Sequence, residues 1–551
     1  MEDVLSLKIT RRAAIAAGLA AGASARALTQ AAGETSWEKL AAEYQTPDWF
    51  RDAKFGIWAH WGPQCQPEHG DWYARMMYMQ GRQSWDHGET AYEHHLKTYG
   101  HPSKTGFIDI IGRWKAEHWD PAYLLSRYRK AGAKYFMAMA NHHDNLDMFD
   151  SSHHGWNTTR VGPGKDIIGT WEKLVRQTDL KFAVSNHSSH AWHWWQTAYG
   201  YDAEGPMKGR RYDAYWIRKH HGKGKFWEGL DPQDLYTGPT YVPPAGITSA
   251  QAMNDWHGKR DGLWLENVPA DAMLQRFVDT WVARQNELVD KYKPDMVYFD
   301  DTGVPFGARG LATVDHFYRR QVEWHGSNQG VITAKLLNPL QKRAIVADVE
   351  RGYAAGIQPV PWQTDTCIGN WHYDRPLYER DGYKKPKDVI QRLADVISKN
   401  GNLMLNIPVR GDGTIDDKEE KVLDGITEWF AANGPAVYGT RPWRRFGEGP
   451  NKPPTGLMAE GEAKPFVAED IRFTAKGGDL FAFFMEWPER ETAVTSLGGN
   501  ALGGARVERV ELLGGGAVQF RHDGDALRLM LPANGNGSIV PVIRIQGQGI
   551  A

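Results

Sequence analysis

Helical stretches alternate with short apolar segments of β type over residues 37–429, and this pattern limits the possible folds more than any other feature of the sequence. For example, the helical stretch 272–290 is followed by the apolar run 296–299. Near-continuous apolar strands that alternate with helices are typical of parallel strands covered by helices. We therefore predict an α/β fold, with a (β/α)8-type barrel over residues 33–440.

The chain of 551 residues exceeds the size at which a single core stops growing, so at least two domains are expected. After residue 435 short alternating strands such as 480–487 are separated by Gly-rich turns, which predicts a C-terminal β-sandwich at 441–551. The stretch 193–265 is rich in Gly, Pro and aromatic residues, and we predict that it is an insertion into the barrel. Its basic residues are expected to form a solvated surface rather than a site for anionic polysaccharides.

The N-terminus has the layout of an export signal. Arg11 and Arg12 precede an apolar run of small residues at 13–25, and Ala-x-Ala sequences follow. We predict a twin-arginine signal at residues 1–32 and a periplasmic or secreted protein, and the alternative is an ordinary helical N-terminus. No later segment has the roughly 18 consecutive apolar residues of a membrane span, so no span is expected.

Composition excludes some partners and leaves others open. The 65 basic and 67 acidic residues give a net charge of -2, which argues against a nucleic-acid partner. The 24 Trp residues suit either sugar-binding pockets or a Trp-rich core. Cys65 and Cys367 are the only cysteines, which are too few for a disulfide scaffold. A bridge between them cannot be argued from sequence, and redox chemistry is not indicated.

Polar residues follow three of the apolar runs. His60, the Asn-His-His-Asp run at 141–144 and the pair Asp300-Asp301 each stand where a predicted strand ends. Catalytic groups of such barrels lie at these ends, so we predict that the three groups converge on one pocket. Singly, each His could be structural and the Asp pair a helix cap. Metal catalysis is the minor interpretation, because adjacent histidines cannot easily bind one ion and no HxH or HExxH motif is present.

Ordered motifs extend over about residues 37–490. They are WFRDAKFGIWAHWG at 49–62, AGAKY at 131–135 with HHD at 142–144, FDS at 149–151, WN at 156–157, DIIG at 166–169, PDMVYFD at 294–300, SKNGNLMLNIP at 398–408, DGTI at 412–415 and NGPAVYGT at 433–440. These motifs resemble those of family 29 glycoside hydrolases, the α-L-fucosidases. The resemblance implies a barrel enzyme that needs no metal or organic cofactor.

The resemblance also implies a double displacement by two carboxyl groups, in which a glycosyl ester forms and water releases the sugar with retained configuration. Asp300 matches the nucleophile, and its neighbour Asp301 should point to the opposite side of the strand. The acid/base of the family lies some tens of residues further on, where Glu350 is our choice and Asp348 and Glu323 are rivals. The alternative is that Glu350 merely pairs with a nearby base.

Family histidines that bind sugar hydroxyls match three positions of this chain, and a neighbouring anchor matches a Trp. The predicted substrate-binding residues are His60, His142, His143, Asp71, Trp72 and Trp362. The chain departs from the family pattern at Asp71, where Glu is usual, and at two predicted strand ends, Ser185-Asn186-His187 and Ile332-Thr333-Ala334-Lys335. These departures predict an altered pocket floor.

The function implied by the resemblance is a retaining, exo-acting α-L-fucosidase that hydrolyses terminal α-L-fucosyl linkages of a fucosylated glycan. The altered pocket leaves open an α-L-galactosidase, since L-galactose differs from L-fucose by one hydroxyl at C6. Two other classes also remain open: a carbohydrate-binding barrel without catalysis, and a metal-dependent hydrolase. Oligomeric state and natural linkage are not readable from the sequence.

Overall fold

The computed structural model describes residues 35–83, 88–260, 272–532 and 538–551. The predicted export signal at 1–32 lies outside the described residues. Eight parallel strands close into a barrel in the order β1 to β8, which confirms the predicted fold class. The strands are β1 (Phe55–Ala59), β2 (Tyr135–Asn141), β3 (Lys181–Asn186), β4 (Met296–Thr302), β5 (Val331–Lys335), β6 (Val346–Asp348), β7 (Trp362–Cys367) and β8 (Gly401–Asn406).

Helices of 9 to 21 residues precede or follow most barrel strands. They are α7 (Pro121–Lys130), α8 (Ile167–Val175), α13 (Ala272–Tyr292), α14 (Ala308–His325), α16 (Pro386–Ser398) and α17 (Asp417–Asn433). The side chains of Asp120, Asp166 and Asp416 accept backbone N–H groups at the starts of α7, α8 and α17, as N-caps do. The connection from β6 to β7, all of which the structure describes, contains no α-helix.

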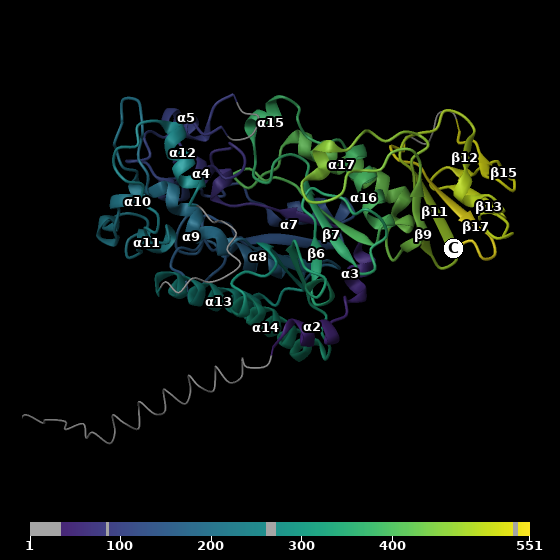
Figure 1. Cartoon of the computed structure of the whole chain (residues 1–551), viewed down its shortest axis with the longest axis horizontal. Coiled ribbons are helices and arrows are strands. Elements are labelled where there is room, and N and C mark those ends of the chain that lie inside the picture. The colour runs from purple at the N-terminus through teal and green to yellow at the C-terminus, as the bar shows by residue number, and fades with distance from the viewer. Residues whose placement is uncertain (1–34, 84–87, 261–271, 533–537) are drawn as a thin grey trace, which may run out of the picture.

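The remaining helices are short. They are α2 (Trp37–Glu43), α3 (Asp48–Ala53), α4 (Tyr73–Met76), α5 (Ala91–Thr98), α6 (Phe107–Arg113), α9 (Ala191–Trp194), α10 (Asp213–Trp216), α11 (Pro232–Leu235), α12 (Ala250–Gly258) and α15 (Arg375–Glu379). Helices α9 to α12 belong to the connection from β3 to β4, which is where the insertion at about 193–265 was predicted. In Figure 1 this region and the C-terminal sheets lie on opposite sides of the barrel. Among the described residues, no helix combines the length and apolar character needed to cross a bilayer.

Alternate residues of the barrel strands belong to two different cores. Trp58, Tyr135, Met296 and Tyr298 pack with one another inside the barrel, whereas Phe299 and other residues of opposite parity pack in the core beneath the helices. This period of two is the geometry of a strand with both faces buried. It fixes which side chain at each strand end points into the barrel.

Glycine allows one close approach in this interior. A Cβ at Gly56 on β1 would lie 2.5 Å from the ring of Tyr135, its register partner on β2. The Tyr135 hydroxyl donates to Gln363 Oε1 across the barrel at 3.1 Å. Packing in the barrel interior therefore requires glycine at position 56, where no side chain competes with the Tyr135 ring.

Two antiparallel sheets follow the barrel and form the C-terminal sandwich (Figure 1). The larger sheet contains β9 (Arg441–Glu448), β10 (Ile471–Lys476), β11 (Asp479–Phe484), β13 (Arg509–Leu512), β14 (Gly516–Ala517) and β17 (Val542–Gln546), and the smaller contains β12 (Thr492–Val494), β15 (Phe520–His522) and β16 (Leu527–Leu529). Buried residues of both sheets share one apolar core. A buried ion-pair cluster joins this domain to the barrel, because Arg472 of β10 and Lys399 both contact Asp395 of α16 at 2.7 Å.

Candidate active site

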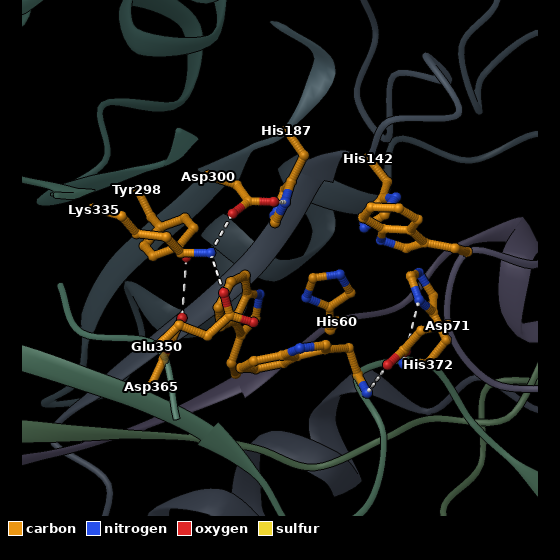
Figure 2. A pocket seen from close by; sticks show the side chains of 13 residues that line it. His60, Asp71, His142, His187, Tyr298, Asp300, Lys335, Glu350, Asp365 and His372 are labelled. Atoms are coloured by element: carbon orange, nitrogen blue, oxygen red, sulfur yellow. Dashed lines mark hydrogen bonds and ion pairs between the residues drawn. The ribbon is translucent and has the colours of Figure 1, made fainter. Parts of the chain in front are cut away.

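A pocket of about 100 Å³ lies among side chains from the carboxyl ends of the barrel strands and the loops after them (Figure 2). Its lining residues are Trp58, His60, Asp71, Trp72, His142, His187, Tyr298, Asp300, Lys335, Glu350, Asp365, Trp371 and His372. Both predicted catalytic residues and four of the six predicted substrate-binding residues line it. The strand ends and the loops after them therefore bring together groups that are more than 300 residues apart in the sequence.

Asp300 points into the barrel because it shares the strand parity of Met296 and Tyr298. Its neighbour Asp301 has the opposite parity, and its carboxylate accepts from Ser189 Oγ at 2.9 Å. Burial raises the pKa of Asp301 to about 6, and the neighbouring His190 opposes part of this rise. Of the two aspartates, only Asp300 lines the pocket.

Three basic groups surround the Asp300 carboxylate. Lys335 Nζ donates to Oδ1 at 2.5 Å, His187 Nδ1 lies 3.0 Å from Oδ2, and His143 Nε2 lies 3.3 Å from the same oxygen. Burial alone would raise the pKa of Asp300, but the charge of Lys335 and the two imidazole hydrogen bonds outweigh burial and hold the pKa well below its usual value. Asp300 is therefore an ionised carboxylate, as a nucleophile must be.

Lys335 joins the two predicted catalytic residues. It is the last residue of β5, and its Nζ donates to Glu350 Oε2 at 2.5 Å as well as to Asp300 Oδ1 at 2.5 Å. The two carboxylate oxygens are therefore at most about 5 Å apart, close to the roughly 5 to 5.5 Å typical of retaining glycosidases. Burial lowers the pKa of Lys335, but Asp300, Glu350 and Asp365 together raise it well above its usual value, so this amine stays charged.

Glu350 lies in the loop after β6 and keeps 17% of its side chain exposed, whereas Lys335 keeps 8%. Asp365, on β7, is 1% exposed and accepts from the Tyr298 hydroxyl at 3.1 Å. Burial and the charge of Glu350 raise the pKa of Asp365 to about 7. The pocket thus contains a second acid at its floor, in addition to Glu350 nearer to solvent.

Five histidines form a cluster at the pocket, namely His60, His142, His143, His187 and His372, and two of them contact Asp300. The ring centroid of His60 lies 5.0 Å from those of His142 and His187 and 4.8 Å from that of His372. Among the described residues, neither ring nitrogen of His60 has a hydrogen-bond partner. Burial and the surrounding imidazoles lower the pKa of His60 and His142 well below the usual value. Neutral imidazoles with free nitrogens are suited to bind the hydroxyl groups of a sugar.

The same histidines also satisfy a distance criterion for a metal site. Nitrogens of His60, His142 and His372 lie within 4.8 Å of one another, and so do those of His142, His143 and His187. The hydrogen bonds of these histidines argue against metal binding by either set. His143 and His187 already use both ring nitrogens, since His143 Nδ1 contacts the carbonyl of His187 at 2.7 Å and His187 Nε2 contacts Ser185 Oγ at 3.1 Å, in addition to their contacts with Asp300.

His142 is held in one tautomer by Gln64. Gln64 Nε2 donates to His142 Nδ1 at 2.8 Å, and the same amide donates to Asp144 Oδ2 and accepts from the backbone N–H of Ala74. The neutral His142 ring therefore carries its proton on Nε2, and an N–H group donates hydrogen bonds but does not ligate a cation. The donor set fits sugar hydroxyls better than a metal ion.

Asp71 and Trp72 line the pocket, and Asp71 also holds part of it in place. Its carboxylate accepts the backbone N–H groups of Trp371 at 3.2 Å and His372 at 2.6 Å. Trp72 has a left-handed backbone at the start of α4. Its ring packs edge to face against that of His143, with the two ring centroids 5.9 Å apart. The loop after β7 thereby delivers Trp371 and His372 to the site.

Three candidates from the sequence lie elsewhere. Trp362 is the first residue of β7 and donates to the carbonyl of Lys399, and its side chain has the opposite parity to the inward-facing Gln363, so the expectation that it binds substrate was wrong. Glu323 is exposed on α14 and pairs with Arg320. Asp348 is buried on β6, accepts from Gln363 at 2.9 Å and does not line the pocket.

Sequence reasoning missed several pocket residues. Lys335 and His187 stood out only as departures from a family pattern, although their positions at strand ends could have marked them as site residues. Tyr298 could have been found from the strand parity that it shares with Asp300, whereas parity alone does not show that Asp365 of β7 faces inward. Trp371 and His372 lie in a loop held by Asp71, and no local signal pointed to them.

Asp300 and Glu350 share Lys335 at the carboxyl ends of a closed parallel barrel, so their facing oxygens are at most about 5 Å apart, and neutral imidazoles lie beside them. A pair of close carboxyl groups next to hydroxyl-binding groups is the chemistry of a glycoside hydrolase, and we assign the chain to that class. The family model described as alpha-L-fucosidase matches residues 20–435. The chain belongs to the α-L-fucosidase family.

Individual relatives agree with this assignment. The tissue alpha-L-fucosidase of Rattus norvegicus is 23% identical over 86% of this chain and 83% of its own length. The alpha-fucosidase of Thermotoga maritima, solved in complex with a mechanism-based inhibitor, has a TM-score of 0.65 at 23% identity over 93% of this chain and 99% of its own. Isoenzyme 1 of the alpha-L-fucosidase from Paenibacillus thiaminolyticus has a TM-score of 0.59 at 20% identity over 93% and 100% of the two chains.

Proposed function

We propose that the protein is a retaining, exo-acting α-L-fucosidase in which Asp300 is the nucleophile and Glu350 the acid/base. The observation that carries the proposal is the bridge from Lys335 Nζ to both carboxylates at 2.5 Å. This spacing leaves room for a sugar carbon between the two groups but not for the additional water that inverting enzymes place there.

In the first step an Asp300 oxygen attacks the anomeric carbon of the fucosyl group. The bond from this carbon to the leaving oxygen breaks, and protonated Glu350 gives its proton to that oxygen. Lys335 helps to keep Asp300 ionised before the attack. The products of this step are the free aglycone and a glycosyl ester on Asp300.

In the second step Glu350, now a carboxylate, takes a proton from water. The water oxygen attacks the anomeric carbon, the ester bond breaks, and the Asp300 carboxylate is restored. Because an ester is neutral, the Lys335 charge is opposed by Glu350 during the lifetime of the intermediate. Lys335 thus has a carboxylate partner in both half-reactions.

Asp365 is the rival acid, since its pKa of about 7 would keep it protonated near neutral pH. We favour Glu350 because a leaving group has to depart towards solvent, and Glu350 is the more exposed of the two acids. The small volume of the pocket supports an exo mode, in which one terminal sugar enters. The neutral histidines would bind the hydroxyls of that sugar.

The test combines stereochemistry and rescue. The wild-type enzyme should release α-L-fucose first from an aryl α-L-fucoside, as followed by proton NMR before mutarotation. Asp300→Gly should lower kcat by at least about 10³-fold, and azide should restore part of the turnover as a fucosyl azide of inverted configuration. Initial release of the β anomer, or full activity of Asp300→Gly, would contradict the proposal.

An α-L-galactosidase is the second candidate, because the pocket contains more polar groups than the hydroxyls of fucose require. Nε2 of His372 and Oδ1 of Asp365 have no hydrogen-bond partner among the described residues. Either group could bond an added C6 hydroxyl. Aryl glycosides of α-L-fucose, α-L-galactose and β-D-galactose, compared by kcat/KM, decide between the candidates. Measurable turnover of any of them would exclude a purely carbohydrate-binding barrel.

We also propose that the protein is exported by the twin-arginine route, a role that rests on the sequence of residues 1–32. Replacing Arg11 and Arg12 together by Lys should retain the protein in the cytoplasm. Cell fractionation and immunoblotting of the two forms provide the measurement. Equal periplasmic amounts of both forms would contradict the proposal.

A further inference from the structure

A segment of the C-terminal domain returns to the active-site face of the barrel. The connection from β9 to β10 covers residues 449–470, and its middle part, Gly456 to Glu462, contacts the loop that carries Glu350. We call residues 456–462 the return segment. It includes the short helix η7 (Ala459–Glu462).

The return segment pairs its backbone with the Glu350 loop. The N–H of Met458 donates to the carbonyl of Glu350 at 2.8 Å, the N–H of Glu460 donates to the carbonyl of Arg351 at 2.8 Å, and the N–H of Gly456 donates to the carbonyl of Tyr353 at 3.0 Å. These three bonds join two parts of the chain that are about 100 residues apart. The backbone of the acid/base is therefore held directly by the C-terminal domain.

The Glu350 loop is also held by the barrel and has little room to move. The N–H of Arg351 donates to the carbonyl of Asp365 on β7 at 2.8 Å, and Arg351 has a left-handed backbone with a φ of 45°. A Cβ at Gly352 would lie 2.1 Å from the carbonyl oxygen of Gly456. The loop is thus clamped between β7 and the return segment, and a side chain at 352 would push the two apart.

Glu460 anchors the return segment by its side chain. Its carboxylate lies 3.0 Å from Arg392 Nη1, 3.4 Å from Lys384 Nζ and 3.7 Å from Arg351 Nε, and it accepts from Thr366 Oγ1 at 2.9 Å. The Glu460 side chain is 16% exposed and that of Arg392 is 3% exposed. Burial raises the pKa of Glu460, but Arg392 and Lys384 outweigh it and lower the pKa. The anchor is a charged group fixed by residues of β7, of α16 and of the loops that precede these two elements.

From this geometry we infer that the return segment sets the position of the acid/base, with Glu460 as its positioning residue. The inference rests on the proposed role of Glu350. Glu460 does not line the pocket, so its influence runs through the backbone of residues 350–353. A displacement of Glu350 by about 1 Å would impair proton transfer to the leaving oxygen, whereas attack by Asp300 would be unaffected.

The experiment exploits the dependence of acid catalysis on the leaving group. 2,4-Dinitrophenol departs without protonation, but the alcohol of an α-L-fucosyl disaccharide does not. Glu460→Gln should lower kcat/KM for the disaccharide by about 10-fold or more and change that for the dinitrophenyl α-L-fucoside by less than about threefold. Thr366→Val, a milder change that removes one hydrogen bond to Glu460, should act in the same direction with a smaller effect.

Glu462→Gln is the matched control, because Glu462 lies in the same short helix and is exposed. This variant should have the same kcat/KM as the wild type for both substrates. The inference would be overturned if kcat/KM fell equally for both substrates in Glu460→Gln and Thr366→Val, or if it fell in neither variant. If Glu460→Gln does not fold, Thr366→Val decides alone by the same criterion.

Glu350→Gln separates this inference from the proposed function. If Glu350→Gln shows the strong leaving-group dependence and the variants at 460 and 366 do not, the acid/base assignment stands and the positioning role is wrong. If Glu350→Gln has no effect on either substrate, the acid/base assignment itself is wrong, and the positioning role that rests on it is wrong as well.

Discussion

Lys335 supplies the positive charge that allows two carboxyl groups to lie side by side in a buried pocket. Without this charge, Asp300 would be more easily protonated, because burial raises its pKa and Lys335 is the group that lowers this pKa most strongly. Lys335→Met should therefore lower kcat/KM by about 10²-fold or more. Lys335→Arg keeps the charge and should retain much of the activity.

The pH profile offers a separate measurement of the same charge. In the wild type the Asp300 carboxylate stays ionised down to low pH, since its pKa is lowered well below the usual value. Removing the cation raises this pKa, and activity that needs the ionised form is then lost at a higher pH. The acidic limb of the kcat/KM profile should shift upwards in Lys335→Met and stay in place in Lys335→Arg. If the acidic limb of Lys335→Met is unchanged, Lys335 does not set the pKa of Asp300.

The hydrogen bonds of the histidine cluster predict that chelators do not change the activity. Gln64 fixes His142 as an N–H donor towards the pocket, which suits a hydroxyl and not a metal. Prolonged dialysis against EDTA should leave kcat/KM within about twofold of the untreated enzyme. Loss of activity that added Zn²⁺ restores would favour the metal-dependent hydrolase instead.

At the scale of single elements, strand parity was the most informative property of the sequence. It correctly separated Asp300 from Asp301, because a period of two is local and needs no knowledge of the partner strands. It did not help with Trp362, because parity alone does not say which alternate residues of β7 face inward. The inward set became clear only from the hydrogen bond between the Tyr135 hydroxyl and Gln363 across the barrel. The His372 loop was unpredictable for a similar reason, since its anchor Asp71 is 301 residues away in the sequence.

Strand β1 gives a stability prediction at this scale. Gly56→Ala would place a methyl group 2.5 Å from the Tyr135 ring in the barrel interior, and either the ring or the strand has to shift. We expect a loss of about 1 to 3 kcal/mol in the free energy of unfolding, measured by urea denaturation. Gly258→Ala is the control, because a Cβ there meets no atom within 4 Å, and it should change stability by less than about 1 kcal/mol.

For the whole molecule, the barrel and the C-terminal sheets behave as one structure joined by buried charge. Arg472 and Lys399 both contact Asp395, and the three side chains are at most 2% exposed. Arg472→Met would leave Asp395 with one cation and should destabilise the protein by about 3 kcal/mol. Differential scanning calorimetry should show a lower Tm.

The matched control for this interface is Arg509→Met in the same C-terminal sheet. Arg509 is 62% exposed and pairs with Glu511, and exposed pairs contribute little to stability. Its Tm should stay within about 2 °C of the wild type. A similar fall in Tm for both variants would mean that the buried cluster has no special role in joining the domains.

The missing helix between β6 and β7 has a consequence for anyone who builds chimeras from this scaffold. Most barrel strands are preceded by an α-helix, but the loop between these two strands is bonded through its backbone to residues 456–462 as well as to β7. A barrel excised at residue 440 would lose three hydrogen bonds beside its own reaction centre. Transplanted catalytic modules should therefore carry residues 449–470 with them, and the natural unit of exchange is the complete two-domain protein.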